Sequence, residues 1–177
     1  MLSILRHLLA VLLLPFTVVV VIPRWLLSDF EHGAWGAGAV ADGLSRVAGV
    51  VVFATGFALF AWCVSLFARV GRGTLAPWDP TQRLVAVGPY RHVRNPMISG
   101  VLLMLAGEAL FWRSGALALW AGAFLLINHA YFLLSEEPGM ERRFGESYRE
   151  YRSHVPRWIP RIRAWTENSR RLPQEPR

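Results

Sequence analysis

Four long apolar runs constrain the fold of this chain more than any other feature of its sequence. They cover residues 4–22, 47–68, 97–112 and 115–135. A run of about 20 apolar residues can cross a bilayer as a helix, and the third run is short for that purpose. Since 54% of the 177 residues are hydrophobic, the chain has more apolar material than the core of a soluble domain of this size needs. The sequence therefore predicts an all-α integral membrane protein with about four transmembrane helices.

The first run has a second interpretation as a cleaved signal peptide. It is longer than the apolar region of such a peptide, which spans roughly 7 to 15 residues. Its last residues and those that follow, Val-Val-Val-Val-Ile-Pro-Arg, also lack the small side chains of a cleavage site. We therefore favour a transmembrane helix over residues 4–22.

Small residues and a tight connection predict how the helices pack. Gly49 and Gly56 lie in the second run, where small residues let membrane helices approach closely. Arg113-Ser114 alone separates the last two runs, so these helices should form an antiparallel hairpin. The hairpin would bring residues 95–96 and 136–137 to the same face of the membrane.

The arginines predict the orientation of the helices. All 19 basic residues are arginine, and the formal net charge is +7. Residues 69–97 carry five arginines against Asp79, whereas residues 23–46 carry two arginines against three acids. By the positive-inside rule, residues 69–97 and both termini are cytoplasmic, in what we expect to be a bacterial inner membrane. The charges lie at the ends of apolar runs, which suits anionic lipid head groups rather than nucleic acid.

A single membrane domain is expected over residues 1–165. After the last run, the sequence predicts a cytoplasmic amphipathic helix over residues 139–153. Aromatic side chains recur on that helix at spacings of four and three, and we expect them to pack on the bilayer surface or on the hairpin: Phe144, Tyr148 and Tyr151. Residues 166–177 are rich in Arg, Pro, Glu and Gln, and are predicted to be a disordered tail.

Two polar segments at the predicted cytoplasmic face have a composition that suits a ligand site. Arg91 and Arg94 lie just before the hairpin, and Glu136 and Glu137 lie at its end. One positive and one negative wall beside lipid would suit a zwitterionic ligand. In the alternative interpretation, the arginines anchor to lipid head groups and the carboxylates cap the helix that follows. The residues alone leave both interpretations open.

These segments together resemble a known family. Its motifs match Leu84-Val85-Ala86-Val87-Gly88-Pro89-Tyr90-Arg91-His92-Val93-Arg94-Asn95-Pro96, then Glu136-Glu137, then Phe144-Gly145-Glu146-Ser147-Tyr148-Arg149-Glu150-Tyr151 and Val155-Pro156-Arg157-Trp158-Ile159-Pro160. In this order, around a membrane hairpin, they are similar to the isoprenylcysteine carboxyl methyltransferase and phospholipid methyltransferase superfamily. The likeness covers roughly residues 71–160.

The resemblance implies an integral membrane enzyme that transfers a methyl group from S-adenosylmethionine. Its acceptor would be lipid-borne or a small hydrophobic molecule, such as an isoprenylcysteine carboxylate, a phospholipid amine or a thiol. The cofactor pocket would face the cytoplasm, and the acceptor would enter from the bilayer. Matched to the family motif, the cofactor-binding positions are Gln82, Arg83, Leu84, Val85, Tyr90, Asn95, Pro96, Met97, Ile98 and Glu137, with Arg91 or Arg94 on the cofactor carboxylate.

Departures from the family pattern leave the acceptor open. Many relatives have Arg-His-Pro-x-Tyr where this chain has Arg94-Asn95-Pro96-Met97-Ile98. Leu133 stands where the eukaryotic prenylcysteine enzymes have an arginine for the substrate carboxylate, so oxygen, nitrogen and sulfur acceptors all stay possible.

No catalytic side chain is certain from the sequence. Methyl transfer mainly needs alignment of the reactants and exclusion of water. The candidates for a catalytic role are Arg94, Glu136 and His92. An amine or thiol acceptor would first lose a proton, and His92, His129 and Glu136 are the residues considered as its base.

Other classes of function fit less well. The five histidines are scattered without a paired spacing, so no metal site is expected. Gly71-Arg72-Gly73 follows no strand and lacks the rest of a phosphate-binding motif. A non-catalytic membrane adaptor or sensor would share the helices, and it is the alternative to an enzyme.

Overall fold

The structure is a computed structural model, and it describes residues 14–29, 39–66, 69, 84 and 86–166. In that part of the chain, every regular element is a helix. The α-helices are α2 (Ile22–Asp29), α3 (Ala39–Leu66), α4 (Pro96–Trp112), α5 (Gly115–Tyr131) and α6 (Glu137–His154). Two π-helical segments, η1 (Thr17–Val21) and η4 (Phe132–Glu136), precede α2 and α6, and a 3-10 turn, η3 (Gly88–Arg91), precedes α4.

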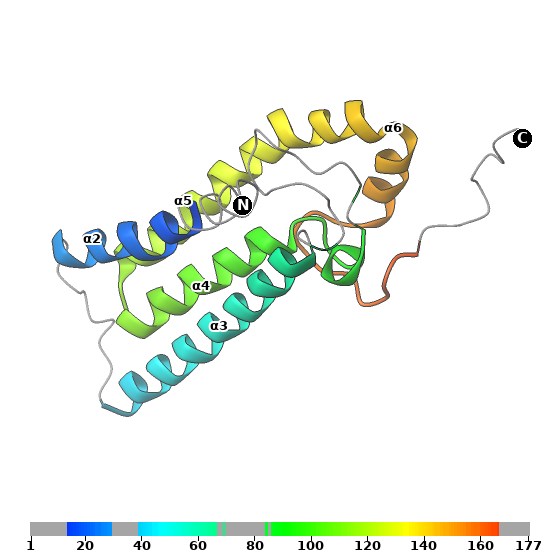
Figure 1. Ribbon diagram of the computed structural model, residues 1–177. Coiled ribbons are helices and arrows are strands. Elements are labelled where there is room, and N and C mark those ends of the chain that lie inside the picture. The colour runs from blue at the N-terminus through cyan, green and yellow to red at the C-terminus, as the bar shows by residue number, and fades with distance from the viewer. Residues whose placement is uncertain (1–13, 30–38, 67–68, 70–83, 85, 167–177) are drawn as a thin grey trace, which may run out of the picture.

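The helices form an antiparallel bundle with two different ends. Figure 1 shows α4 between α3 and α5, with α2 beside α5. Asp42 and Arg113 lie at one end, which we call the distal end, where they form an ion pair. The other end, which we call the polar end, contains residues 86–97 and 132–165. The predicted hairpin is confirmed, and it brings the two predicted ligand segments to the polar end.

Glycines bring α3 and α4 into backbone contact. A Cβ atom built on Gly49 would lie 2.7 Å from the carbonyl oxygen of Gly107, and one on Gly56 would lie 2.6 Å from that of Gly100. No side chain fits at such distances, so the two helices approach as closely as their backbones allow. The predicted packing role of Gly49 and Gly56 is confirmed, and Gly100 and Gly107 are their partners.

Two helical stretches are long and apolar enough to cross a membrane. They are α3 and the continuous helix from Gly115 to His154. Only 22% and 11% of their most apolar stretches are buried inside the protein, so most of this apolar surface faces outward. That distribution fits an integral membrane protein. The predicted count of four spans stays a prediction, because α4 is shorter and residues 1–13 lie outside the described part.

The last long helix extends well beyond the bilayer. The uninterrupted part before the kink at Gly145, residues 115–144, is about 45 Å long, which exceeds the hydrocarbon core of about 30 Å. Its sequence is apolar as far as Leu134 and is polar from Ser135 onward. We therefore treat α5 and the residues up to Leu134 as the membrane-crossing part.

Two predicted helix ends were wrong, because each helix continues through the proline that was expected to end it. The run 4–22 was expected to end before Pro23, but helix continues to Asp29. In η1 the Ile22 N–H bonds to the Thr17 carbonyl, which shifts the hydrogen bonding by one residue. In that register Pro23 leaves the Val18 carbonyl free, and the Trp120 indole N–H donates to it at 3.1 Å.

The same arrangement joins α5 to α6. The Glu137 N–H bonds to the Phe132 carbonyl in η4, and Pro138 follows directly. The sequence predicted a helix over 115–135 and a separate one over 139–153. The structure instead has uninterrupted helix from Gly115 to Phe144, a kink at Gly145, where φ is 53° and ψ is −127°, and then helix again to His154.

Two further predictions need correction. Helix α3 begins at Ala39 rather than at residue 47, because Asp42 pairs with Arg113 and the Ser45 hydroxyl donates to the Leu110 carbonyl at 2.6 Å. These contacts satisfy polar side chains that we expected to lie in a loop. Along α6, the predicted aromatic stripe packs neither on lipid nor on the hairpin. It forms a cluster with Leu84, Ala86, Val155 and Trp165, in which Phe144 takes part with Tyr148 and Tyr151.

We predict that a methyl group at the α3–α4 contact destabilises the protein. Gly56→Ala or Gly100→Ala forces a Cβ into backbone atoms, so the free energy of unfolding should fall by about 1–3 kcal/mol. Thermal unfolding of the purified protein in detergent measures this.

The matched control is Gly43→Ala in the same helix, where a Cβ would meet nothing within 4 Å. Its effect should be neutral or stabilising by up to about 1 kcal/mol, since alanine is the better helix former. Equal effects of Gly43→Ala and Gly56→Ala would contradict the close approach of α3 and α4.

Candidate functional site

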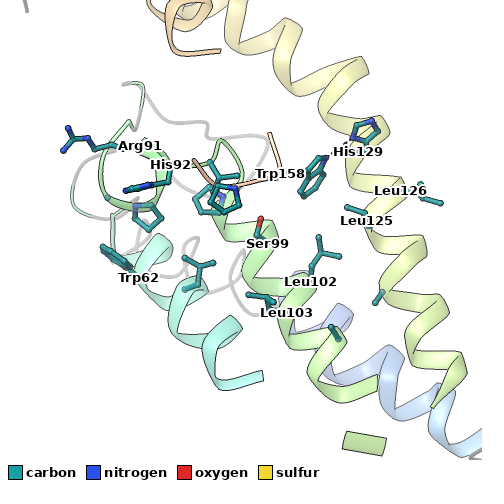
Figure 2. Close-up of a pocket in the computed structure, with 18 of the residues that line it drawn as sticks. Trp62, Arg91, His92, Ser99, Leu102, Leu103, Leu125, Leu126, His129 and Trp158 are labelled. Carbon is teal, nitrogen blue, oxygen red and sulfur yellow. Dashed lines mark hydrogen bonds between the residues drawn. The ribbon is translucent and has the colours of Figure 1, made fainter. Parts of the chain in front are cut away.

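An apolar cavity of about 1250 Å³ lies at the junction of the bundle and the polar end. Its sides come from α3, α4 and α5, and its roof comes from the η3 segment and residues 158–164. Apolar side chains make most of the lining, including Leu102, Leu103 and Leu125 (Figure 2). The exposed side chains of Trp62 and Leu126 border it, so the cavity opens toward the outer surface of the helices.

Polar side chains gather where the cavity meets its roof. The lining includes Arg91, His92, Ser99 and His129. Figure 2 shows His129 of α5 beside Trp158, and Arg91 extending away from α4 and α5. The Trp158 indole N–H donates to His129 Nδ1 at 3.0 Å. The cavity is therefore apolar along the helices and has hydrogen-bonding groups at one end only.

The C-terminal segment clamps the loop that precedes α4. The Arg94 N–H donates to the Pro156 carbonyl, and the Trp165 N–H donates to the Arg91 carbonyl, both at 2.9 Å. Side chains add to this, since Arg91 Nε donates to the Trp165 carbonyl at 2.5 Å. The Tyr151 hydroxyl also donates to the Tyr90 carbonyl at 2.7 Å. The loop predicted to bind cofactor is thus held by residues far along the chain.

A buried ion cluster joins this loop to the long helix. The Glu137 Oε1 atom accepts from Arg94 Nη1 at 2.8 Å and from Arg157 Nε at 2.7 Å, and the Glu137 side chain is only 7% exposed. Its Oε2 lies 3.7 Å from Arg152 Nε, which is too far for a hydrogen bond. Burial opposes ionisation, but the hydrogen bond from Arg157 and the three arginine charges outweigh it and hold the pKa of Glu137 below its ordinary 4.5.

The neighbouring carboxyl group has the opposite environment. Burial, and then the negative charge of Glu137, raise the pKa of Glu136 from 4.5 to about 7, although Arg94 partly opposes them. No hydrogen bond or ion pair of Glu136 is found among the described residues. In the same part of the chain, the buried Arg94 Nε also lacks an acceptor. The ion cluster therefore contains one unpaired donor beside one unpaired carboxyl group.

The structure separates the predicted site residues into two sets. Arg91, His92 and Pro96 line the cavity. Arg94, Glu136 and Glu137 belong to the ion cluster and are not among the residues that line the cavity. The positive and negative walls predicted from the sequence are therefore not opposite sides of one pocket. Arg94 pairs directly with Glu137, and Arg91 bonds to the main chain at Trp165.

The remaining predicted residues lie around these two sets. Asn95 is the N-cap of α4, and its carbonyl accepts from the Ser99 hydroxyl at 3.0 Å. Tyr90 is buried against Cys63, to which its hydroxyl is hydrogen-bonded, so its ring supports the loop. Met97 packs in the core, Ile98 is half-buried, Leu84 packs on the aromatic cluster of α6, and Gln82, Arg83 and Val85 lie outside the described residues.

The sequence prediction missed the C-terminal contributions to the site. Arg157 and Trp158 were noted only as part of a family motif, and Arg161 and Trp165 were not singled out. The signal that marks them is weak, because these residues belong to no periodic element. The group of tryptophans and arginines directly after the last helix is the sequence feature that could have indicated these contacts with the loop.

The family model for phospholipid methyltransferases matches residues 44–147. That match covers more than half of the chain, from early α3 into α6. The chain belongs to the phospholipid methyltransferase family. The match contains the η3 loop, the hairpin and the Glu136-Glu137 pair, whereas the roof residues 158–164 and the ion-pair partners Arg152 and Arg157 lie beyond it.

Two curated proteins are similar to parts of this chain. Methanethiol S-methyltransferase 2 of Bradyrhizobium diazoefficiens is 36% identical over 76 residues, which are 41% of this chain and 27% of that protein. An uncharacterized protein of Haemophilus influenzae is 35% identical over 65 residues, which are 36% of this chain and 100% of that protein. The chain therefore spans about a quarter of the length of the named relative. No solved structure matches the chain. The family and the outward-facing apolar helices together fit an integral membrane protein.

We predict that Glu137→Gln destabilises the protein in a pH-dependent way. The change leaves Arg94 and Arg157 without a carboxylate, and removing one partner of a buried pair costs about 3–5 kcal/mol. Because the pKa of Glu137 is lowered on folding, its contribution is complete above about pH 4.5 and is lost as the pH falls through the folded-state value. Melting curves of wild type and variant should therefore converge on acidification, and a constant difference would contradict the ion cluster.

The opposite pH dependence is expected for Glu136→Gln. Because the pKa of Glu136 is raised on folding, its ionisation costs stability from about pH 4.5 upward, and the full cost is reached above about pH 7. The variant without ligand should melt several degrees higher than wild type at pH 8, and at about the same temperature at pH 4. A variant that is less stable than wild type at pH 8 would show that Glu136 is paired.

Proposed function

We propose that this methyltransferase uses S-adenosylmethionine as its methyl donor and methylates a hydrophobic acceptor that enters the cavity from the bilayer. The location of the cavity is the main observation that supports this proposal. It runs from the outer surface of apolar helices to polar side chains on the loop inside the family match. The ion cluster and the cavity both contact this loop, so a donor at the cluster and an acceptor in the cavity would lie next to each other.

The groups around the ion cluster suit this cofactor. S-adenosylmethionine has two cationic groups, the sulfonium and the ammonium, and one carboxylate. The unpaired Glu136 carboxyl group and the available Glu137 Oε2 are acceptors for cationic or hydroxyl groups, and Arg94 Nε is an unpaired donor for a carboxylate. A neutral apolar ligand would use none of these groups.

We assign cofactor contact to the ion-cluster side of the loop. Asn95, Ile98, Glu136 and Glu137 would provide the side chains, and Pro96 would lie where the methyl group of the cofactor meets the cavity. Gln82, Arg83, Leu84, Val85, Tyr90, Arg91 and Met97 stay proposed members of the site, of which Tyr90 and Met97 shape the loop from within the core. When bound, S-adenosylmethionine supplies an electrophilic methyl group.

The protein contributes alignment and a dry environment. Pro96 and the half-buried Ser99 lie where the cavity meets the start of α4. An acceptor whose apolar body lies along α4 and α5 would present its reactive atom at this end. Fixing two reactants in this way, without competing water, accounts for much of the rate of such a displacement.

The cavity favours an acceptor with an extended apolar body. Pockets for drug-sized ligands hold about 300–1,000 Å³, and this cavity is larger and almost wholly apolar. A relative named for methanethiol suggests sulfur as the acceptor atom. Leu133, which is 46% exposed and apolar, supplies no charge for a substrate carboxylate, which argues against an isoprenylcysteine.

We also propose the topology predicted from the arginines. The polar end carries Arg91, Arg94, Arg142, Arg143, Arg149, Arg152, Arg157, Arg161 and Arg163, whereas Arg46, Arg113 and Asp42 lie at the distal end. This excess of arginine supports a cytoplasmic polar end. A reporter fused after Arg177 should then be cytoplasmic, and a periplasmic reporter would refute the four-span topology.

We predict saturable binding of S-adenosylmethionine and of its demethylated product by the protein purified in detergent. Glu136→Gln removes a charge-assisted contact and should weaken binding by about 10- to 100-fold. Glu146→Gln is the matched control, because this carboxylate is 85% exposed and pairs with Arg149, and it should bind like wild type. Absence of saturable binding by the wild type would refute the enzyme and favour a membrane adaptor.

A further inference from the structure

The cavity continues toward the distal end as a groove between α4 and α5. At the polar end, α3 contributes Leu59 and Trp62 to the lining, together with the roof. Farther along, the lining comes from α4 and α5, and Figure 2 shows Leu102 and Leu125 between these two helices. The residues nearest the distal end are Ala106, Ala121 and Gly122. The hydrogen-bonding groups therefore lie at one end of an elongated space, and small apolar residues lie at the other.

The hairpin explains why the groove ends at this level. Only Arg113 and Ser114 connect α4 to α5, and the Ser114 hydroxyl accepts from the Leu117 N–H at 3.3 Å. Two helices joined by so short a turn lie against each other beside it and separate with distance from it. None of residues 107–120 lines the cavity. The contact between the helices thus closes the groove on the distal side.

The length of the groove follows from helix geometry. A helix rises 1.5 Å per residue, so the lining of α4 from Pro96 to Ala106 spans about 15 Å. On α5, the lining from Ala121 to His129 spans about 12 Å. An extended alkyl chain advances about 1.3 Å per carbon. The groove therefore matches an unbranched chain of about 9 to 12 carbons whose reactive group lies at the start of α4.

Gly122 at the closed end leaves space that no other residue uses. Where glycines serve helix packing in this protein, a Cβ atom would collide, as one on Gly56 would at 2.6 Å from the Gly100 carbonyl oxygen. A Cβ built on Gly122 would instead meet nothing within 4 Å. The missing side chain of Gly122 therefore does not bring two helices together, and its effect is to lengthen the groove.

We propose that Ala106, Ala121 and Gly122 set the chain length of the methyl acceptor, which is a single-chain amphiphile of about 9 to 12 carbons. The proposal rests on the proposed methyl transfer. The closed end lies between one pair of helices, which suits one chain, and the polar groups at the other end suit the head of an amphiphile. A large side chain at the closed end would shorten the groove by about one helical turn, or roughly four carbons.

A comparison of alkanethiols tests the chain length. Gly122→Leu fills the closed end and should fold, because leucine is the better helix former and the space is free. In transfer of a labelled methyl group, its kcat/KM for decanethiol should fall by about 5- to 100-fold, with less than about a twofold change for butanethiol. Each variant is compared with wild type on the same probe, so the partition of the probe into detergent cancels.

Two further variants complete this comparison. Ala106→Leu fills the groove from the opposite helix and should show the same preference for the short probe. Ala130→Leu is the matched control on α5, because this residue is exposed and does not line the cavity, and it should act on both probes like wild type. Melting temperatures show whether a variant is inactive only because it is unfolded.

Photolabelling locates the chain end without any methyl transfer. Decyl methyl sulfide that carries a diazirine at its chain end should label residues within 102–106 and 121–126 of the protein in detergent. Excess decyl methyl sulfide should compete with this labelling, and Gly122→Leu should reduce it. Labelling that lies only outside the groove, or that does not respond to the competitor, would overturn the proposal.

The outcomes separate this proposal from the proposed function. Equal losses with butanethiol and decanethiol in a folded Gly122→Leu would overturn the chain-length role and leave the methyltransferase intact. Transfer to a two-chain phospholipid, but to none of the thiols, would overturn the single-chain acceptor. If wild type neither binds S-adenosylmethionine nor methylates any probe, the proposed function itself fails, and photolabelling still decides whether an alkyl chain lies in the groove.

Discussion

The ion pairs of Glu137 hold the polar end together. A single carboxylate oxygen accepts from Arg94, which precedes α4, and from Arg157, which follows α6. Three segments that are distant in sequence thus meet at one buried charge. Because removing either partner would leave a charge without compensation, the loop, the long helix and the C-terminal segment are coupled. The roof of the cavity depends on this coupling, since residues 88–96 and 158–164 both form it.

Glu136, which is next to Glu137 in the chain, has a different environment and a different proposed role. Both carboxyl groups lie on one helical stretch, yet one is stabilised as an anion by arginines and the other is destabilised by burial and by its neighbour. A group that costs stability without ligand is well suited to bind a cation. Glu137 therefore maintains the structure, whereas Glu136 provides the binding energy that we assign to the cofactor.

Apolar patterns predicted the parts of the fold that lie within the membrane. The run 97–112 became α4 almost without change, and Gly49 and Gly56 form the predicted helix contact. The hairpin also brought the segment before Pro96 to the Glu136-Glu137 pair, as the contact between Arg94 and Glu137 demonstrates. These features follow from hydrophobicity and connection length, which are local properties of the sequence.

Helix ends and the C-terminal clamp could not be predicted in the same way. A proline normally marks a helix end, but a π-helical turn before Pro23 and Pro138 moves the hydrogen bonds, and in one case a distant Trp120 satisfies the freed carbonyl. The roles of Arg161 and Trp165 depend on backbone contacts with residues 91–92. Such contacts leave no periodic pattern in the sequence. Likewise, the hydrogen bond from Trp158 to His129 joins residues 29 positions apart, and it is visible only in the structure.

The central claim is that the cofactor binds at the ion cluster and the acceptor binds in the apolar cavity next to it. An experimental structure with the demethylated cofactor and hexyl methyl sulfide bound tests it most directly. We predict the cofactor at Asn95, Ile98 and Glu136, and the sulfide in the cavity with its sulfur at the start of α4, near Pro96 and Ser99. A cofactor found inside the apolar cavity, with Glu136 free of ligand, would contradict the account.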